Sequence, residues 1–174
     1  ASNGLKLSKK HSPVDGFTPY PHVKKVNSYH EQVSLDETGL AHFEARLNAH
    51  GNSGHCLLKG PLKRPLNAES RAGKCDRIAY SNLLVLDIDG IKLPGNIQPA
   101  KFVANDVTRL AAQVLAELPE PFHNVSYIAQ ASSSLGLKAE KVSLHIFIFL
   151  TYAMPAKAMK LFLQSANFES DLFK

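Results

Sequence analysis

The sequence of 174 residues has few cysteines and no long apolar run, and these absences limit the classes of protein to which it can belong. Its two cysteines, Cys56 and Cys75, cannot form the disulfide framework of a small secreted domain. The longest apolar runs, LLVL and HIFIFL, are far shorter than the ~20 residues that a membrane-spanning helix needs. The first residues also lack the apolar stretch of a secretory signal. We therefore expect a cytoplasmic protein with no membrane partner.

The excess of basic over acidic residues is confined to the first half of the chain. Residues 1–80 contain 12 Lys and Arg against 7 Asp and Glu, whereas residues 81–174 contain 8 of each kind. A basic flank beside a neutral body is typical of a protein that binds a polyanion, such as nucleic acid or nucleotide phosphates. The same excess also fits an ordinary solubilising surface, so the charge alone leaves both interpretations open.

The first half of the chain shows segments of different character. Residues 1–33 are punctuated by Pro and Gly without periodicity, which predicts an extended arm whose first few residues resemble a tag remnant. Ser34 and Glu37 fit a capping box, and the apolar spacing that follows predicts a helix over 34–49 that Gly51 ends. The remainder of this small α/β unit, residues 34–80, is predicted as a short strand over 55–59 and a basic polar loop over 60–78.

Residues 81–174 alternate between strand-like and helix-like patterns. The strand patterns cover 82–89, 124–131 and 142–152, and the helix patterns cover 99–118 and 155–168. Gly90 is expected to break the first strand. The order β-α-β-β-α predicts an α+β fold, an RRM-like (ferredoxin-like) module that lacks its last strand. We expect that strand beyond Lys174, so that the chain is a truncated part of a longer protein.

Two acidic and two other polar residues are predicted to meet on one face of this sheet. Asp87 and Asp89 share a face of the first strand, and Ser143 and His145 share a face of the third. In an RRM-like sheet these two strands are adjacent and antiparallel, which brings the four side chains together on the face without helices. Each motif also has a purely structural interpretation, because Asp89-Gly90 fits a turn and a lone histidine in an apolar strand fits a core residue.

Two carboxylates this close repel each other unless a cation binds them. Their oxygens suit Mg²⁺ or Mn²⁺, and such pairs commonly hold two metals for phosphoryl transfer. His145 and Ser143 would then hydrogen-bond the phosphate oxygens of a nucleotide. The sequence therefore predicts a divalent-metal and nucleotide site on this face.

The segments LLVLDIDG and VSLHIFIF resemble motifs I (D-x-D) and II (s-x-H) of the archaeo-eukaryotic primase superfamily, and of phage and plasmid primase-polymerases in particular. The resemblance covers residues ~34–174. It implies a nucleotidyltransferase that joins nucleoside triphosphates on a DNA template. It further implies that Asp87 and Asp89 bind the catalytic metals and that Ser143 and His145 contact the triphosphate.

The family also has a third acid downstream of motif II. Only Glu169 and Asp171 lie there in this chain, so either is a candidate metal ligand, unless the ligand lies beyond Lys174. The implied partners are a DNA template and primer and nucleoside triphosphates, with a helicase fused in longer chains of this kind. A gene carried by a mobile element in a bacterial or archaeal host is implied as well.

Basic residues between 57 and 77 lead directly into the strand that carries Asp87. Among them Lys59, Arg71 and Lys74 are predicted to contact triphosphate or template phosphates, although a solvated loop explains the same composition. The segment does not have the spacing of a Walker A loop. His50, His55, Cys56 and Cys75 match no usual zinc spacing.

Two classes of alternative remain. LDIDG also resembles the haloacid-dehalogenase motif, though Ile91 stands where that motif has Thr, and D-x-D occurs in glycosyltransferases that use sugar nucleotides. The other alternative is a non-catalytic RRM-type nucleic-acid-binding module, in which Phe147 and Phe149 would stack on bases. Nucleotide binding that depends on a divalent metal would distinguish an enzyme from such a module.

Overall fold

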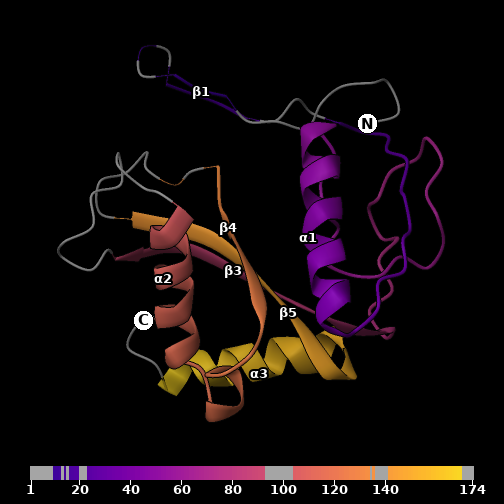
Figure 1. Cartoon of the computed structure of the whole chain (residues 1–174). Coiled ribbons are helices and arrows are strands. Elements are labelled where there is room, and N and C mark those ends of the chain that lie inside the picture. The colour runs from indigo at the N-terminus through magenta and orange to yellow at the C-terminus, as the bar shows by residue number, and fades with distance from the viewer. Residues whose placement is uncertain are drawn as a thin grey trace. The chain divides into compact units, whose positions relative to one another are not determined.

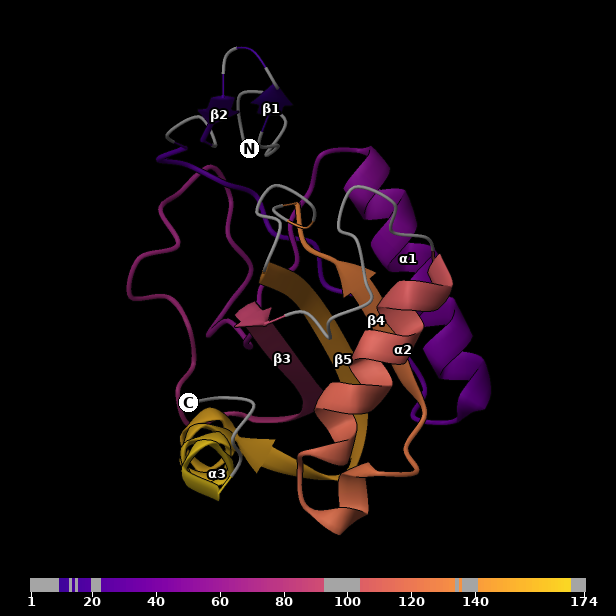
Figure 2. The same ribbon diagram turned by 90° about the vertical axis from the view of Figure 1, so that its left-hand side faces the viewer.

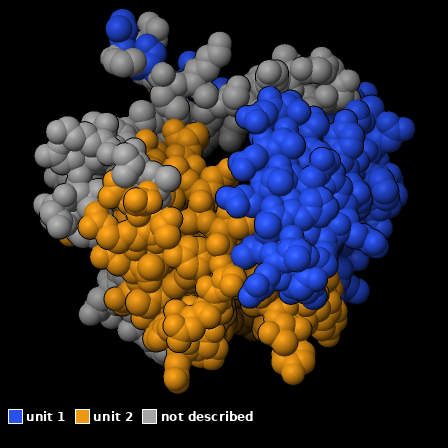
Figure 3. Space-filling view, in the orientation of Figure 1, with its two compact units in different colours: residues 1–79 blue, residues 80–174 orange. Residues whose placement is uncertain are grey.

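The computed structural model divides the chain into two compact units, residues 1–79 and residues 80–174, which Figure 3 shows in blue and orange. It describes residues 10–12, 14, 16–19, 23–92, 104–133, 135 and 141–169. None of the helices in these ranges is long and apolar enough to cross a bilayer.

Unit 1 contains a long helix and a short hairpin; Figure 1 labels the helix and the first strand of the hairpin, and Figure 2 labels both strands. Its elements are the antiparallel strands β1 (Lys10–Ser12) and β2 (Gly16–Thr18) and the helix α1 (Glu37–Asn52). The arm predicted over 1–33 thus includes a hairpin, which strands of three residues are too short to reveal by alternation. The polar loop over 60–78 contains no helix or strand, as predicted, and its ladder-type pairing is limited to two isolated bridges, Val26 with Glu69 and Leu62 with Cys75.

The start of α1 differs from the prediction because Asp36 caps the helix in place of Ser34. Asp36 Oδ1 accepts a hydrogen bond from the Gly39 amide at 2.8 Å and from the hydroxyls of Thr38 and Ser34 at 2.6 and 3.0 Å. These bonds, chiefly the one from Thr38, lower the pKa of Asp36. The capping box predicted for Ser34 and Glu37 is therefore wrong, since the carboxylate is the group that satisfies the free amide of the first turn.

The end of α1 also lies further along the chain than predicted. The helix continues through Gly51 to Asn52. Residues 55–59, predicted as a strand, form no ladder. Instead the His55 amide donates to the carbonyl of His50 at 2.9 Å, so the chain turns back against the last helical turn.

Unit 2 is a three-stranded antiparallel sheet with two α-helices. Its elements are β3 (Tyr80–Lys92), α2 (Ala104–Ala116), the 3-10 turn η2 (Glu120–Phe122), β4 (Tyr127–Ala131), β5 (Lys141–Pro155) and α3 (Ala156–Glu169). The strand β5 lies between β3 and β4 and is antiparallel to both, as Figure 2 shows, so β3 and β4 run parallel to each other. The predicted order β-α-β-β-α is confirmed, while Pro99 lies outside the described residues.

Alternation along the strands places the core on one face of the sheet. The residues of that face that are at most 8% exposed are Leu84, Leu86, Ile88, Val142, Leu144, Ile146 and Ile148. They pack with the apolar side of α2, which includes Leu110 and Val114, and with Met159 and Leu163 of α3. Each fully buried leucine or isoleucine stabilises the fold by about 1.5–3 kcal/mol. The two aliphatic strand faces predicted to lie under helices are thus confirmed.

The strand β3 does not break at Gly90. Asp89 pairs with Ser143 and Ile91 pairs with Val142, so Gly90 is an extra residue opposite a continuous β5. Its φ is +82°, a conformation that only glycine adopts without strain, and together these features define a β-bulge. The turn predicted as the structural interpretation of Asp89-Gly90 is therefore wrong, because the ladder continues to Lys92.

Candidate functional site

The four polar residues of the two motifs are neighbours across one ladder. Asp87 is the register partner of His145, and Asp89 is the register partner of Ser143. Because side chains alternate along each strand, all four lie on the face opposite the helices. The predicted meeting of the two motifs on adjacent antiparallel strands is confirmed, and the register adds which residues are opposite each other.

Each acid has a polar partner on β5. His145 Nε2 lies 3.0 Å from Asp87 Oδ1, and the Ser143 hydroxyl donates to Asp89 Oδ1 at 2.8 Å. Both acids are exposed, whereas their partners differ, since the side chain of His145 is 26% exposed and Ser143 is only 5% exposed. With a quarter of its side chain exposed and a carboxylate beside it, His145 is not the core histidine of the structural interpretation.

Two residues that border this site were not identified from the sequence. Gln130 of β4 is the register partner of His145 on its other side, and it is exposed on the same face. Lys141 lies next to the bulge, with its Nζ 3.7 Å from the place where a Cβ on Gly90 would stand. The sequence shows that Gln130 and Lys141 are polar residues of their strands, but only the strand register shows which residues lie opposite each other.

The donor set fits a hard divalent cation. Proteins usually bind Mg²⁺ through one or two carboxylates, while water and substrate phosphates complete its coordination. Asp87 and Asp89 supply that number of carboxylates on one open face. Within the described ranges, no group of three or more His, Cys, Asp or Glu side chains is placed to hold a metal ion. The side chain of Glu169 and the whole of Asp171 lie outside those ranges, so a third acidic ligand stays a prediction.

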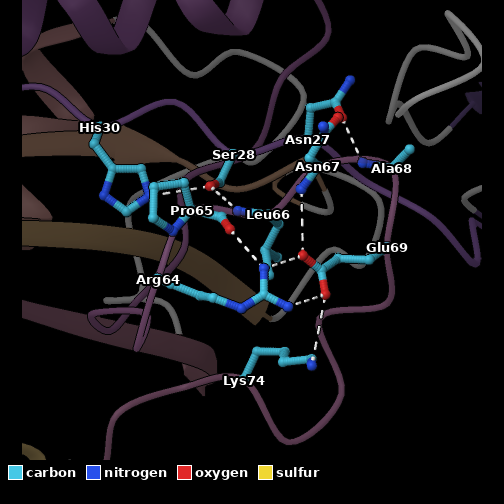
Figure 4. Close-up of polar contacts among 10 residues, drawn as sticks. All are labelled: Asn27, Ser28, His30, Arg64, Pro65, Leu66, Asn67, Ala68, Glu69 and Lys74. Atoms are coloured by element: carbon cyan, nitrogen blue, oxygen red, sulfur yellow. Dashed lines mark hydrogen bonds and ion pairs between the residues drawn. The ribbon is translucent and has the colours of Figure 1, made fainter.

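The three cations predicted to contact phosphate lie in unit 1, whereas the acids lie in unit 2. Lys74 Nζ is 3.5 Å from Glu69 Oε2, so part of its charge is already paired (Figure 4). Arg71 is exposed in a turn that the Lys74 amide closes on the Arg71 carbonyl at 3.1 Å. Lys59 is exposed as well. Contact of these three residues with phosphate stays a prediction.

The loop that carries Arg71 and Lys74 is attached to the arm by specific hydrogen bonds, which Figure 4 draws. The Leu66 amide donates to the Ser28 hydroxyl at 2.8 Å, and the Ala68 amide donates to Asn27 Oδ1 at 2.7 Å. Within the loop, Arg64 donates to both oxygens of Glu69, with Nη2 2.7 Å from Oε2. This bond lowers the pKa of Glu69 to about 2. Polar residues thus fix the path of a segment that has no regular structure.

A second polar cluster joins the arm to α1. The Nδ1 atoms of His50 and His55 are 2.9 Å apart, and the ring of Tyr29 stacks on His55 with 5.1 Å between centroids. Glu31 Oε1 is 2.9 Å from His50 Nε2, and Glu31 Oε2 accepts from Arg46 Nε at 2.6 Å. These two hydrogen bonds, with Arg46 the larger influence, lower the pKa of Glu31 to about 2. The histidines therefore form part of an attachment point between two segments of unit 1.

No protein-family model matches this chain, and neither a curated protein nor a solved structure matches it. The functional interpretation therefore depends on the residues and their geometry.

Proposed function

We propose that this chain is the catalytic core of a DNA primase-polymerase, with an RRM-like module as its centre. The observation that supports this proposal most strongly is the register of two adjacent strands, which pairs Asp87 with His145 and Asp89 with Ser143 on one face. The arrangement of β3, β5 and β4, with α2 and α3 against the opposite face, supports the RRM-like assignment. The resemblance of the two motifs to those of primases adds the substrate class.

In the proposed reaction a primer 3′-hydroxyl attacks the α-phosphorus of a nucleoside triphosphate, and pyrophosphate leaves. Asp87 and Asp89 would hold Mg²⁺ or Mn²⁺ at this face through their carboxylate oxygens. A cation held there would supply Lewis-acid stabilisation of the charge that develops on the attacking and leaving oxygens. His145 lies beside Asp87 and donates a hydrogen bond to a phosphate oxygen of the triphosphate.

The partners of this reaction are a DNA template, a primer and nucleoside triphosphates, with a helicase in a longer chain. Lys59 and Arg71, exposed on unit 1, are the basic residues proposed to attract their phosphates. The proposed setting is the cytoplasm of a bacterial or archaeal host.

The burial of Phe147 argues against the non-catalytic alternative. An RRM-type module stacks bases on exposed aromatic rings of its central strands. Phe147 is only 3% exposed, and its ring centroid is 6.3 Å from that of His145. The acids Asp87 and Asp89 would also repel nucleic-acid phosphates in the absence of a cation.

The test replaces both acids with their amides, which have nearly the same shape but no charge. Binding of a fluorescent nucleoside triphosphate is measured with Mn²⁺ and with EDTA, and primer extension is measured on a single-stranded DNA template. We expect the unmodified chain to bind the triphosphate only with Mn²⁺. The double variant Asp87→Asn with Asp89→Asn should lose this binding and all extension.

The matched control is Asp106→Asn, the same chemical change at a partly exposed position of α2, where Asp106 pairs with Arg109 at 3.1 Å. It should bind and extend as the unmodified chain does. Triphosphate binding by the unmodified chain that ignores EDTA would instead indicate a stacking module. Undiminished extension by the double variant would refute the proposed catalytic role of both acids.

A further inference from the structure

Ser143 is held differently from the other polar residues of the site. It is the one buried polar side chain among the described residues, with 5% of its surface exposed. Its hydroxyl donates to Asp89 Oδ1 at 2.8 Å, across the pair of strands in which the two residues are register partners. Its carbonyl accepts from the Ser132 amide at 3.0 Å, so the backbone at this position is fixed as well.

A serine hydroxyl carries a single proton, which it can donate to one strong acceptor. An ionised carboxylate and a phosphate oxygen are both acceptors, so Ser143 cannot serve both with the same proton. In this structure the proton is directed to Asp89. Burial of Ser143 further separates its hydroxyl from a ligand that approaches from solvent.

We propose that Ser143 is a positioning residue that orients the Asp89 carboxylate for a divalent cation, and that it does not contact nucleotide phosphates. This inference rests on the proposed metal site, and it differs from the role that the primase resemblance implies for Ser143. The bond to Oδ1 fixes the rotation of the Asp89 side chain, so that its second oxygen has a defined direction. Hydrogen bonds that orient a metal-binding carboxylate typically change metal affinity by about 10–100-fold.

The contrast between the two acids supports this division of roles. Asp87 is more than half exposed, and its partner His145 is itself partly open to solvent. Asp89 is exposed as well, but its partner is a buried donor, and the Gly90 bulge follows it in β3. One acid is thus held by a fixed neighbour and the other lies beside a group that a ligand can reach.

The experiment measures Mn²⁺ binding to the full 174-residue chain by isothermal titration calorimetry, without nucleotide and without any assay of activity. Ser143→Ala should bind Mn²⁺ about 10-fold more weakly than the unmodified chain. Ser143→Thr keeps the hydroxyl and should retain the affinity within about 3-fold, because it restores the donor. Ser143→Cys has nearly the same size but only a weak donor, and it should lose affinity as Ser143→Ala does, which guards against misfolding of a single variant.

The control variant is Ser34→Ala, which removes another serine hydroxyl that donates to an aspartate, Asp36, at 3.0 Å in unit 1. Its Mn²⁺ affinity should be unchanged. In parallel, triphosphate binding is measured at a Mn²⁺ concentration that saturates each variant, where Ser143→Ala should match the unmodified chain.

Each outcome bears on a different claim. Equal Mn²⁺ affinity of Ser143→Ala and the unmodified chain, combined with weaker triphosphate binding at saturating Mn²⁺, would overturn the positioning role and restore a phosphate contact. Equal values in both measurements would overturn the inference as well, while the proposed function would stand. An unmodified chain that binds no Mn²⁺ would refute the proposed function together with this inference.

Discussion

Substitution of Gly90 tests the bulge that follows the Asp89–Ser143 pair in β3. A Cβ on Gly90 would meet only the end of the Lys141 side chain, with Cδ at 3.6 Å and Nζ at 3.7 Å, which is ordinary contact. The cost of Gly90→Ala therefore comes from the backbone, whose φ of +82° an L-residue adopts at a cost of about 1–2 kcal/mol. Alanine also restricts the unfolded chain, which offsets about 0.5 kcal/mol. We expect a net loss of about 1 kcal/mol.

Three variants at position 90 distinguish a bulge with a positive φ from a regular extended strand. At a positive φ, asparagine is tolerated better than alanine, and a β-branched residue is tolerated least. The expected order of stability at position 90 is therefore Gly, then Asn, then Ala, then Val. A regular extended strand predicts the opposite preference, with Val the most stable, because β-branched residues favour the pleated conformation.

The assay is urea unfolding followed by far-UV circular dichroism. With a slope of ~2 kcal/mol per molar urea, a loss of about 1 kcal/mol lowers the midpoint by about 0.5 M. If Gly90→Val unfolds at a higher urea concentration than the unmodified chain, the bulge and the reasoning built on it are wrong.

Two further predictions concern unit 1. Gly39→Ala should destabilise the chain by more than about 2 kcal/mol, because its Cβ would stand 2.0 Å from the Ser34 carbonyl oxygen. Gly51→Ala should instead stabilise α1 by about 0.5–1 kcal/mol, because a Cβ at that position meets no atom within 4 Å. Urea unfolding midpoints of the two variants that move in the same direction would contradict this prediction. The pKa of Glu31 is lowered to about 2, chiefly by its hydrogen bond from Arg46, so its stabilising contribution is complete above the ordinary glutamate range and is lost as pH falls from about 4.5 toward 2. Glu31→Gln should therefore melt at a lower temperature than the unmodified chain at pH 6, and the difference should shrink by pH 2; melting curves separated equally at both pH values would contradict the assigned role.

The sequence predicts unit 2 better than unit 1, and the reason is the length of its patterns. The strands that carry Asp87 and His145 contain 13 and 15 residues, which is long enough for period-two alternation to assign each side chain to a face of the sheet. The bulge could not be foreseen, because a glycine within a strand pattern fits a break as well as an extra residue. Pairing with Val142 on the far side of Gly90 is what distinguishes these two cases.

In unit 1 the decisive contacts join residues far apart in the sequence. Ser34 and Asp36 are both good helix caps, and the choice depends on which group reaches the Gly39 amide. The Ala68 amide finds its acceptor on Asn27, 41 residues earlier, and no local pattern reports such a partner. Short segments of this kind are specified by tertiary contacts, which a single sequence does not display.

The central position of β5 has a consequence for the dynamics of the site. Between Leu144 and Ile148 this strand is paired on both sides, with β3 and with β4. Amide hydrogens in such a strand exchange with solvent only when large parts of the sheet open together. His145 therefore belongs to the slowest-exchanging part of the unit, whereas Ser143 and Asp89 lie at its margin, next to the bulge. Local opening at this end of the sheet would therefore separate Asp89 from Ser143 before it separated Asp87 from His145.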